Sequence, residues 1–341
     1  MIPRMRKASC LAILLFVLLV SWNGKTILPV AIRLQGNTMG TTYHIIYFDS
    51  HNRNFQNPVD SLLLLINKSI NTYDPSSEIS RFNRSTGSFV FKLPYFLPPL
   101  KKSQEVVTAS KGAYDPTVMP LVNAWGFGPK KIERPDTAEI MNLRKFVGFE
   151  KIKFNQDSVW KNDPHVQIDF SAIGQGYGAD VIAEFFKSKS IENYFIELGG
   201  EGVARGKNLS ENRFWQVGIL VPNSNYMESK FIAEAILKNK AFTTSGNYYN
   251  YREVDGKRYS HTIDPSSGFP VQHELLSATV FALDCATADA WATAFMSMGH
   301  VRALEILKGH PELDVFFVYS SPGGNKTFVS KGMERYVKFE K

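Results

Sequence analysis

The chain has 341 residues, of which 44% are hydrophobic and 21% charged, a length and composition that suit one large domain or two smaller ones. Its formal net charge of +7 is spread along the sequence, and the lack of a Lys/Arg-rich run argues against a nucleic-acid-binding protein. With only two cysteines, Cys10 and Cys285, we expect neither a disulfide nor a cysteine-based metal site.

The first residues have the pattern of a membrane-targeting segment. Arg4, Arg6 and Lys7 precede an apolar run over residues 8–22, which is typical of a secretory signal or a short membrane anchor. A buried core helix is the alternative, but such a helix rarely begins at a basic N-terminus. We therefore predict a signal or anchor segment over residues 1–24, whose cleavage the sequence leaves open because no A-x-A site follows. Since the positive flank stays inside the cell, the rest of the chain is expected outside the cytoplasm.

Hydrophobic periodicity and turn residues predict strands and helices that are interleaved without a regular rhythm. No internal repeat is present, and this irregular order favours an α+β fold with two lobes. The predicted elements, in chain order, are a strand at 41–48, helices at 59–71, 99–111 and 137–146, a strand at 166–170, a helix at 178–187, strands at 194–198, 215–221 and 278–283, helices at 285–294 and 301–308, and a strand at 314–319.

The segment 285–294 (CATADAWATA) combines helix-forming alanines with one carboxylate and one hydroxyl. Asp289 and Thr293 are four residues apart, so on a helix their side-chain oxygens lie on one face and can point at one spot. The simpler interpretation is that Thr287 caps the helix and Asp289 complements the positive end of its dipole. Taken alone, the segment favours this simpler interpretation.

Glycine-rich stretches mark several corners of the chain. The run 174–178 (GQGYG) follows a predicted strand and precedes a predicted helix, where glycines let a ligand approach the backbone and the helix N-terminus offers N–H groups to a phosphate. Its spacing is not that of the dinucleotide-binding fingerprint, and no Walker A motif occurs. The stretches 197–202 (ELGGEG) and 243–249 (TTSGNYY) are predicted as a plain bulge and a plain turn.

Two further motifs carry polar and aromatic side chains. Residues 260–268 (SHTIDPSSG) place His261 next to a tight turn. The pKa of a histidine lies near neutrality, so a protonated histidine can offset the negative charge of a phosphate. A single histidine is more often structural. Residues 112–128 include aromatic side chains that either stack on a planar ring or simply pack: Tyr114, Trp125 and Phe127.

These motifs occur in a specific order along the chain. They are GNTMGTTY (36–43), YDPSSEISRFN (73–83), GAYDPTVMPLVNAWGFG (112–128), DFSAIGQGY (169–177), GG (199–200), TSG (244–246), HTIDPSSG (261–268) and TADAWAT (287–293). In this order the set resembles the ApbE family, the FAD:protein FMN transferases, from about residue 34 to the C-terminus. Residues 25–341 are therefore predicted to form one flavin transferase domain with an α+β, two-lobed mixed α/β fold.

The resemblance implies an exported, membrane-tethered enzyme that cleaves FAD and transfers FMN to a threonine or serine hydroxyl of a flavoprotein. Such an enzyme releases AMP and requires Mg²⁺. The implied acceptor carries the motif Asp-x-x-[Ser/Thr]-Gly-Ala-[Ser/Thr] and is typically a subunit of a membrane redox pump. The catalytic domain is then expected on the periplasmic side of a bacterial inner membrane.

The same resemblance assigns roles to individual residues. Asp289 and Thr293 match the metal ligands, and Ala172 matches a position that contacts the metal through its backbone carbonyl. His261 matches a histidine next to the pyrophosphate, and Asp289 is the candidate proton acceptor, so these two residues are the predicted catalytic pair. The positions that contact FAD in the family are matched by Met39, Tyr73, Ala113, Tyr114, Asp115, Asp169, Gln175 and Ile263.

Among these residues, Tyr73 and Tyr114 are expected to stack on the flavin or adenine ring. Two positions depart from the family pattern. Gln175 stands where many members carry Lys or Glu, so a charged contact to the dinucleotide is lost, and Trp291 is bulkier than the residue in many relatives.

Two other functions stay open at this point. An FAD pyrophosphatase with the same Mg²⁺ site would use water in place of a protein hydroxyl and would release FMN and AMP. An exported FAD-binding protein would store the flavin without turnover, but the pairing of Asp289 with Thr293 speaks against it, because a pure binder needs no metal site. Transferase and hydrolase differ in how an acceptor docks, which the sequence does not reveal.

Overall fold

The structure is a computed structural model that describes residues 29–128, 136–222, 230–247, 251–254 and 257–340. The predicted targeting segment, residues 1–24, lies outside the described residues. Within these ranges, no helix has both the length and the apolar character needed to cross a membrane.

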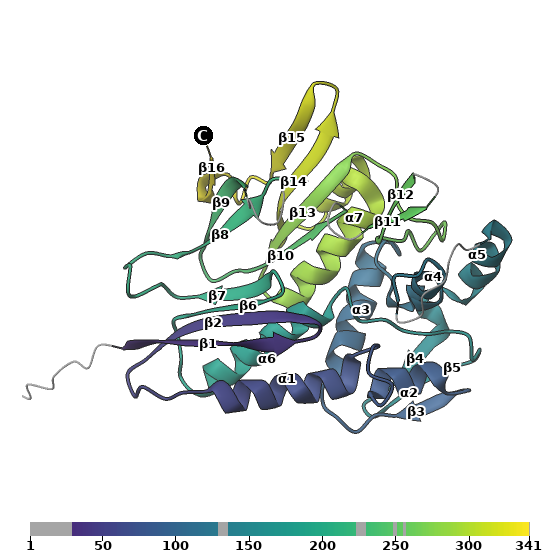
Figure 1. Ribbon diagram of the computed structural model, residues 1–341, viewed down its shortest axis with the longest axis horizontal. Helices are drawn as coiled ribbons and strands as arrows, with labels where there is room; N and C mark the ends of the chain where they lie inside the picture. Colours follow the sequence, from purple (N-terminus) through teal and green to yellow (C-terminus); the bar gives the residue numbers. More distant parts are fainter. Residues whose placement is uncertain (1–28, 129–135, 223–229, 248–250, 255–256, 341) are drawn as a thin grey trace, which may run out of the picture.

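An eight-stranded sheet forms the centre of the molecule (Figure 1). Every pairing between neighbouring strands of this sheet is antiparallel. In spatial order its strands are β1 (Val30–Thr38), β2 (Thr41–Asp49), β6 (Tyr194–Leu198), β7 (Glu201–Arg205), β10 (Ala241–Gly246), β13 (Leu275–Ala282), β14 (Asp314–Ser321) and β15 (Gly324–Val329).

Both faces of the sheet are covered, because its central strands carry apolar residues on both sides. In β14, Val315 and Phe317 join the core on the helical face, whereas Phe316 and Val318 join the core on the opposite face. Two helices pack against the helical face: α6 (Gly174–Ser188) and α7 (Cys285–Leu307). The other face is covered by a small sheet of β8 (Trp215–Leu220), β9 (Phe231–Leu237) and β16 (Val337–Phe339).

Helix α1 (Gln56–Ile70) shows why the helices form where they do. Its buried apolar residues Val59, Leu63, Ile66 and Ile70 recur at helical spacing and form one stripe. Part of this stripe packs with β2 and α6, so the helix is held against the edge of the sheet.

A second, smaller lobe lies beside the sheet in Figure 1 and comes mostly from residues between α1 and α6. Its core joins the helical face of the sheet through α3, which contacts α7. The elements of this region are α2 (Glu78–Arg84), α3 (Leu97–Ala109), α4 (Met119–Ala124), α5 (Thr137–Leu143), a three-stranded sheet of β3 (Ser88–Val90), β5 (Ser158–Lys161) and β4 (Ile152–Phe154), and the hairpin of β11 (Tyr251–Val254) and β12 (Lys257–Ser260).

The predicted α+β class and most predicted elements are confirmed, but the strand expected at 166–170 is wrong. This segment belongs to no strand, and Ile168 bonds to a side chain: Asn83 Oδ1 accepts from the N–H of Ile168 at 2.7 Å, and Asn83 Nδ2 donates to the carbonyl of Ile168 at 2.8 Å. The next residue, Asp169, donates its N–H to the carbonyl of Pro116. The sequence shows a β-like pattern here, but the backbone bonds to the Asn83 side chain and to the carbonyl of Pro116 instead of to a neighbouring strand.

Three glycine-containing stretches also differ from their predicted form. The run 174–178, predicted as a turn before a helix, is itself the first part of α6. The stretch 197–202 is a tight hairpin between two strands, and residues 243–246 lie in β10. At 243–246 backbone pairing with β13 outweighs the local preference of glycine for turns, whereas Gly199 and Gly200 form the hairpin turn itself.

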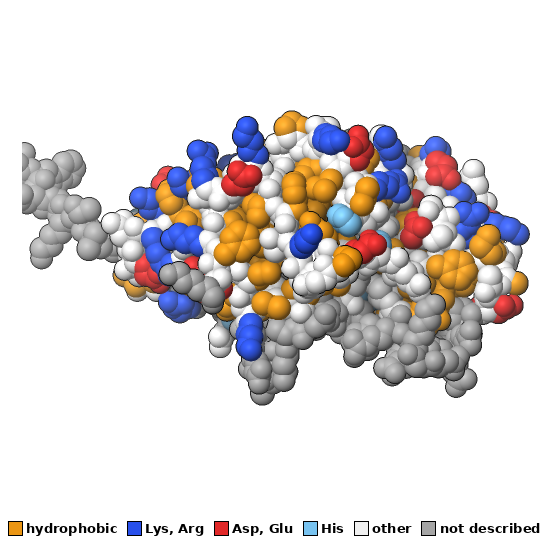
Figure 2. Space-filling model, turned by 90° about the horizontal axis from the view of Figure 1, so that it is seen from above, with side chains coloured by type: hydrophobic (Ala, Val, Ile, Leu, Met, Phe, Trp, Pro, Cys, Tyr) orange, Lys and Arg blue, Asp and Glu red, His pale blue; other side chains and the backbone are white. Residues whose placement is uncertain are grey.

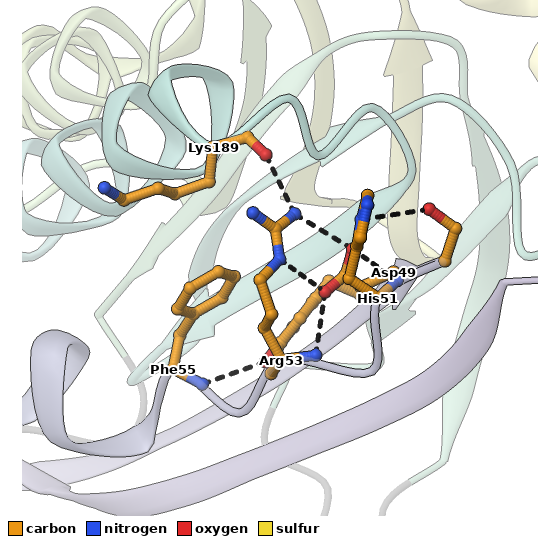
Figure 3. Close-up of polar contacts among 7 residues, drawn as sticks. Asp49, His51, Arg53, Phe55 and Lys189 are labelled. Carbon is orange, nitrogen blue, oxygen red and sulfur yellow. Dashed lines mark hydrogen bonds and ion pairs between the residues drawn. The ribbon is translucent and has the colours of Figure 1, made fainter.

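An ion pair between buried Asp49 and partly exposed Arg53 fixes the connection between β2 and α1 (Figure 3). Asp49 Oδ2 accepts from the backbone N and the Nε of Arg53, both at 2.8 Å, and Asp49 Oδ1 accepts from Arg53 Nη2 at 2.9 Å. Arg53 Nη2 also donates to the carbonyl of Lys189, which follows the last turn of α6. The Arg53 guanidinium holds the pKa of the Asp49 carboxyl well below its usual range.

The Asp49→Asn variant should lose about 1 kcal/mol of unfolding free energy at neutral pH, because it removes the charge that pairs with Arg53, whose partly exposed side chain is screened by solvent. The folded-state pKa of Asp49 is lowered, so this stabilisation is complete above the unfolded-state pKa of about 4 and is lost as the pH falls below it. Urea unfolding at pH 7 and pH 3 measures the difference from the unsubstituted chain, which should shrink at pH 3. Asp157→Asn, at an exposed position, is the control. An equal difference at both pH values contradicts this role of the carboxylate.

Candidate functional site

A cavity of about 370 Å³ lies where the N-terminus of α6 faces the second turn of α7. Its walls come from both lobes and from the loop after β12. The sequence-predicted residues that line it are Tyr73, Ala113, Tyr114, Asp115, Asp169, Ala172, Gln175, His261, Ile263, Asp289 and Thr293. The structure therefore brings together residues that lie far apart in the chain.

A second cavity of about 410 Å³ adjoins the first and shares Tyr73, Ser171 and Gln175 with it. Met39, the remaining predicted site residue, lines this second cavity from the tip of the β1–β2 hairpin. The backbone of Met39 has φ +50° and that of Gly40 has φ +75°, as a tight two-residue hairpin turn requires. Because the two cavities share part of their lining, an extended ligand can contact both.

Helix α7 is anchored at its N-terminus by two carboxylates. Asp284 is the capping residue and accepts from the N–H of Thr287 at 2.8 Å. Asp180, on α6, accepts from the N–H groups of Cys285 and Ala286, each at 2.8 Å. The simpler interpretation from the sequence is thus wrong about the cap, because Thr287 lies inside the helix. Burial raises the pKa of Asp180 to about 7.

Asp289 lies one turn further along α7 and points at the N-terminus of α6. It is buried, and its Oδ2 accepts from the N–H of Gly176 at 3.1 Å. The two helices approach so closely that a Cβ on Gly176 would lie 2.5 Å from the carbonyl oxygen of Cys285. The positive end of α6 favours the charged form of Asp289, but burial is the larger effect and raises its pKa.

The predicted metal ligands lie in one cavity. Thr293 is one turn beyond Asp289 on α7, and Ala172 is in the loop that leads into α6. Carboxylate, hydroxyl and carbonyl oxygens are the donors that Mg²⁺ prefers, and a site that a substrate phosphate completes needs few of them. The described residues contain no group of three or more His, Cys, Asp or Glu side chains able to hold a metal. A cation in this cavity would therefore depend on hydroxyl and backbone oxygens as well.

The two other predicted acidic residues hold the backbone of the site. Asp115 is buried; its Oδ1 accepts from the N and Oγ1 of Thr117, and its Oδ2 accepts from the N–H of Phe149. Asp169 Oδ1 accepts from the N of Ser171 at 2.9 Å and from its Oγ at 2.6 Å. Burial raises the pKa of both carboxyls. Both oxygens of Asp115 have structural partners, so this residue shapes the cavity wall.

The two tyrosines expected to stack on a ring behave differently. Tyr73 is 61% exposed, and its hydroxyl donates to the carbonyl of Phe127 at 3.1 Å. Tyr114 is only 2% exposed, and its hydroxyl is hydrogen-bonded to Ser103 at 2.9 Å. The expectation that Tyr114 stacks on a ligand ring is therefore wrong, because its ring is part of the core. Tyr73 has an accessible ring at the boundary of the two cavities.

The remaining predicted residues occupy the walls. His261 contacts the ring of Phe127 edge-on, with the ring centres 6.4 Å apart. Ile263 is buried and pairs through its backbone with Pro270. Gln175 is the second residue of α6 and lines both cavities, which places it at their junction.

The sequence interpretation missed Glu201, which lines the first cavity from the start of β7. Its Oε2 is inaccessible to solvent and has no hydrogen-bond partner among the described residues. Burial raises its pKa, and the charge of Asp289 adds to this effect. A signal was present in the sequence, since a glutamate two residues before the apolar Val203 lies on the same face of a strand.

The comparison with known proteins identifies the family. Residues 39–317 match the family model described as "ApbE family". The chain belongs to the ApbE family. Solved members of this family share the fold of this chain as well.

Among its relatives in the ApbE family, the FAD:protein FMN transferase of Vibrio cholerae is 36% identical over 90% of this chain and 92% of its own length. The FAD:protein FMN transferase of Haemophilus influenzae is 34% identical, over 90% of this chain and 91% of its own. The solved flavin transferase ApbE of Vibrio cholerae superposes with a TM-score of 0.81 at 33% identity, covering 90% of this chain and 99% of that one. The flavinyl transferase ApbE of Pseudomonas stutzeri gives 0.80 at 29% identity, covering 91% and 98%.

Proposed function

We propose that this ApbE-family chain is a Mg²⁺-dependent FAD:protein FMN transferase. It cleaves FAD, attaches FMN by a phosphoester bond to a threonine or serine of a target flavoprotein, and releases AMP. The observation that carries the proposal is the meeting of Asp289, Thr293 and Ala172 in one wall of a cavity that continues toward Tyr73 and Met39. The named relatives support flavin transfer as the reaction class.

Asp289, Thr293 and the carbonyl of Ala172 would hold the metal. They fit Mg²⁺ because all three offer oxygen donors and because the cavity contains a buried carboxylate oxygen without a partner among the described residues, on Glu201. When bound, Mg²⁺ supplies charge neutralisation at the pyrophosphate and stabilises the departing phosphate.

The residues of the chain position the reactants. The acceptor hydroxyl attacks the phosphorus on the FMN side, so an O–P bond forms to the acceptor while the P–O bond to AMP breaks. The proton of the hydroxyl passes to a carboxylate, for which Asp289 is our candidate. The N-terminus of α6 directs backbone N–H groups at this wall, which favours anionic groups such as phosphates. His261, when protonated, offsets negative charge on the pyrophosphate.

The proposed acceptor carries the motif Asp-x-x-[Ser/Thr]-Gly-Ala-[Ser/Thr] and is a subunit of a membrane redox pump. The basic flank and apolar run at the N-terminus support a location at a bacterial inner membrane, with the catalytic domain on the periplasmic side.

Over the face shown in Figure 2, Lys and Arg side chains are dispersed and Asp and Glu side chains lie among them, without a block of one sign.

Incubation with FAD, Mg²⁺ and an acceptor that carries this motif tests the proposal. In-gel flavin fluorescence of the denatured acceptor reports covalent attachment, and AMP and FMN are quantified in the same reaction with and without chelator. We expect chelator-sensitive labelling with one AMP for each FMN attached, and no labelling when the motif's acceptor Thr or Ser is replaced by Ala. Release of free FMN and AMP without labelling identifies a pyrophosphatase, and FAD left intact identifies a binding protein.

The His261→Ala variant should lower kcat on the order of 10²-fold while changing the Kd for FAD much less, because the proposed role concerns charge on the reacting phosphates. Single-turnover labelling and fluorescence titration of FAD measure the two quantities. His165→Ala, at an exposed position outside the cavity, is the matched control. An unchanged kcat assigns His261 to packing against Phe127.

A further inference from the structure

We propose that Glu201 and Asp289 form a two-carboxylate site that takes a divalent cation before FAD binds. The inference rests on the proposed function, and it adds both a residue and an order of binding to it. With Asp289 as the sole carboxylate, the cation would depend on the phosphates of FAD for most of its negative ligands. A second carboxylate in the same cavity supplies a further negative ligand from the protein itself.

The fold directs Glu201 at the site. It follows the β6–β7 turn, where Gly199 has φ +62° and Gly200 has φ +108°, and its backbone pairs with Leu198 across the hairpin. Side chains alternate along a strand, and Val203, two residues on, belongs to the core beneath α6. Glu201 therefore points at the helical face of the sheet, where α6 and α7 converge.

The turn is tightly packed against the N-terminus of α6, which fixes the backbone from which Glu201 projects. A Cβ on Gly199 would lie 2.5 Å from Nε2 of Gln175, the second residue of α6. The third residue of that helix, Gly176, donates its N–H to Asp289. One helix end thus contacts both the turn that carries Glu201 and the carboxylate of Asp289.

The described residues place no permanent positive charge in this cavity. Glu201 Oε2 is shielded from solvent and accepts no hydrogen bond from the described residues, a costly arrangement for a carboxylate. The negative charge of Asp289 acts on it directly. Neither Lys nor Arg is among the described residues that line the cavity. A divalent cation with oxygen-donor preference satisfies both carboxylates, and Thr293 adds a neutral oxygen beside them.

Titration of the full-length protein with Mn²⁺ in the absence of FAD, followed by the loss of the free-ion EPR signal, tests this inference. We expect one bound Mn²⁺ per chain, and an affinity that falls 10- to 100-fold in Glu201→Gln. Glutamine keeps the size and one acceptor oxygen of glutamate, so near-UV circular dichroism should be unchanged. Glu184→Gln, an exposed position on α6, removes the same charge and should bind Mn²⁺ as the unsubstituted chain does.

A second measurement separates cation binding from a carboxylate pair that merely shares a proton. Mn²⁺ should raise the Tm of the unsubstituted chain without FAD, and Glu201→Gln should lose most of that rise. An equal affinity and equal Tm rise in Glu201→Gln overturn the inference, as does a chain that binds Mn²⁺ only when FAD is present. Either result leaves the proposed function standing, whereas FMN transfer that is insensitive to chelator removes the metal from that function and this inference with it.

Discussion

The Asp289→Asn variant should lose FMN transfer by a factor on the order of 10³ or more, because the only acidic side chain of the proposed metal-binding trio is removed. Asparagine keeps the shape of the side chain and an oxygen that can accept from the N–H of Gly176, so the contact between α7 and α6 persists. Labelling of the acceptor, followed by in-gel flavin fluorescence over a range of Mg²⁺ concentrations, measures the loss.

The control for this variant is Asp264→Asn. Asp264 is acidic and lies three residues after His261, but it is not among the residues that line the cavity. It should label the acceptor within a few-fold of the unsubstituted chain. If Asp289→Asn labels the acceptor normally, α7 has no part in the reaction, and the mechanism proposed above is wrong. Unfolding in urea should confirm that the stability of Asp289→Asn is close to that of the unsubstituted chain.

The Gly176→Ala variant should lower activity on the order of 10²-fold even though alanine favours helix, because a displacement near 1 Å at a reacting centre has an effect of this size. The added Cβ would lie 2.5 Å from the carbonyl oxygen of Cys285 and 2.8 Å from the Cβ of Asp289. Backbone atoms cannot move aside as a flexible side chain can, so α7 must shift and carry Asp289 with it. We expect an unfolding free energy lower by about 1–3 kcal/mol as well.

Gly178→Ala is the matched control on the same helix. Its Cβ would meet only the ends of flexible side chains, at 3.1 Å from Leu198 Cδ2 and 3.3 Å from Met39 Cε. It should therefore keep most of the activity, with a small change in stability. Equal activity of Gly176→Ala and the unsubstituted chain would show that the spacing of α6 and α7 does not position the reaction.

The sequence predicts much of this fold because local pattern and tertiary context agree over most of the chain. The stripe of Val59, Leu63 and Ile66 specifies α1, and the alternation around Ile196 specifies β6. Prediction fails where backbone partners come from elsewhere. The segment at 166–170 resembles a strand but is bonded by the side chain of Asn83, and β10 contains a glycine-bearing stretch that resembles a turn but pairs with β13.

The site is predicted by motif order more than by any single residue. Asp289 and Thr293 are on one helix face, so the spacing alone brings them together. Ala172, in contrast, is known to face them only from the structure. Glu201 was missed because a glutamate after two glycines at a hairpin usually faces solvent, and burial beside α7 depends on strands that are distant in the sequence. Tyr114 was misjudged because an aromatic ring near a turn serves equally well in the core.

The walls of the first cavity come from positions between Tyr73 and Thr293, supplied by segments that meet only through pairing of distant strands. Closing such long loops makes folding slow, and a continuous fragment must span Tyr73 to Thr293 to contain every lining residue. A shortened version or a grafted helix would therefore carry the motif without the pocket. The cavity therefore forms only after most of the polypeptide has reached its native topology.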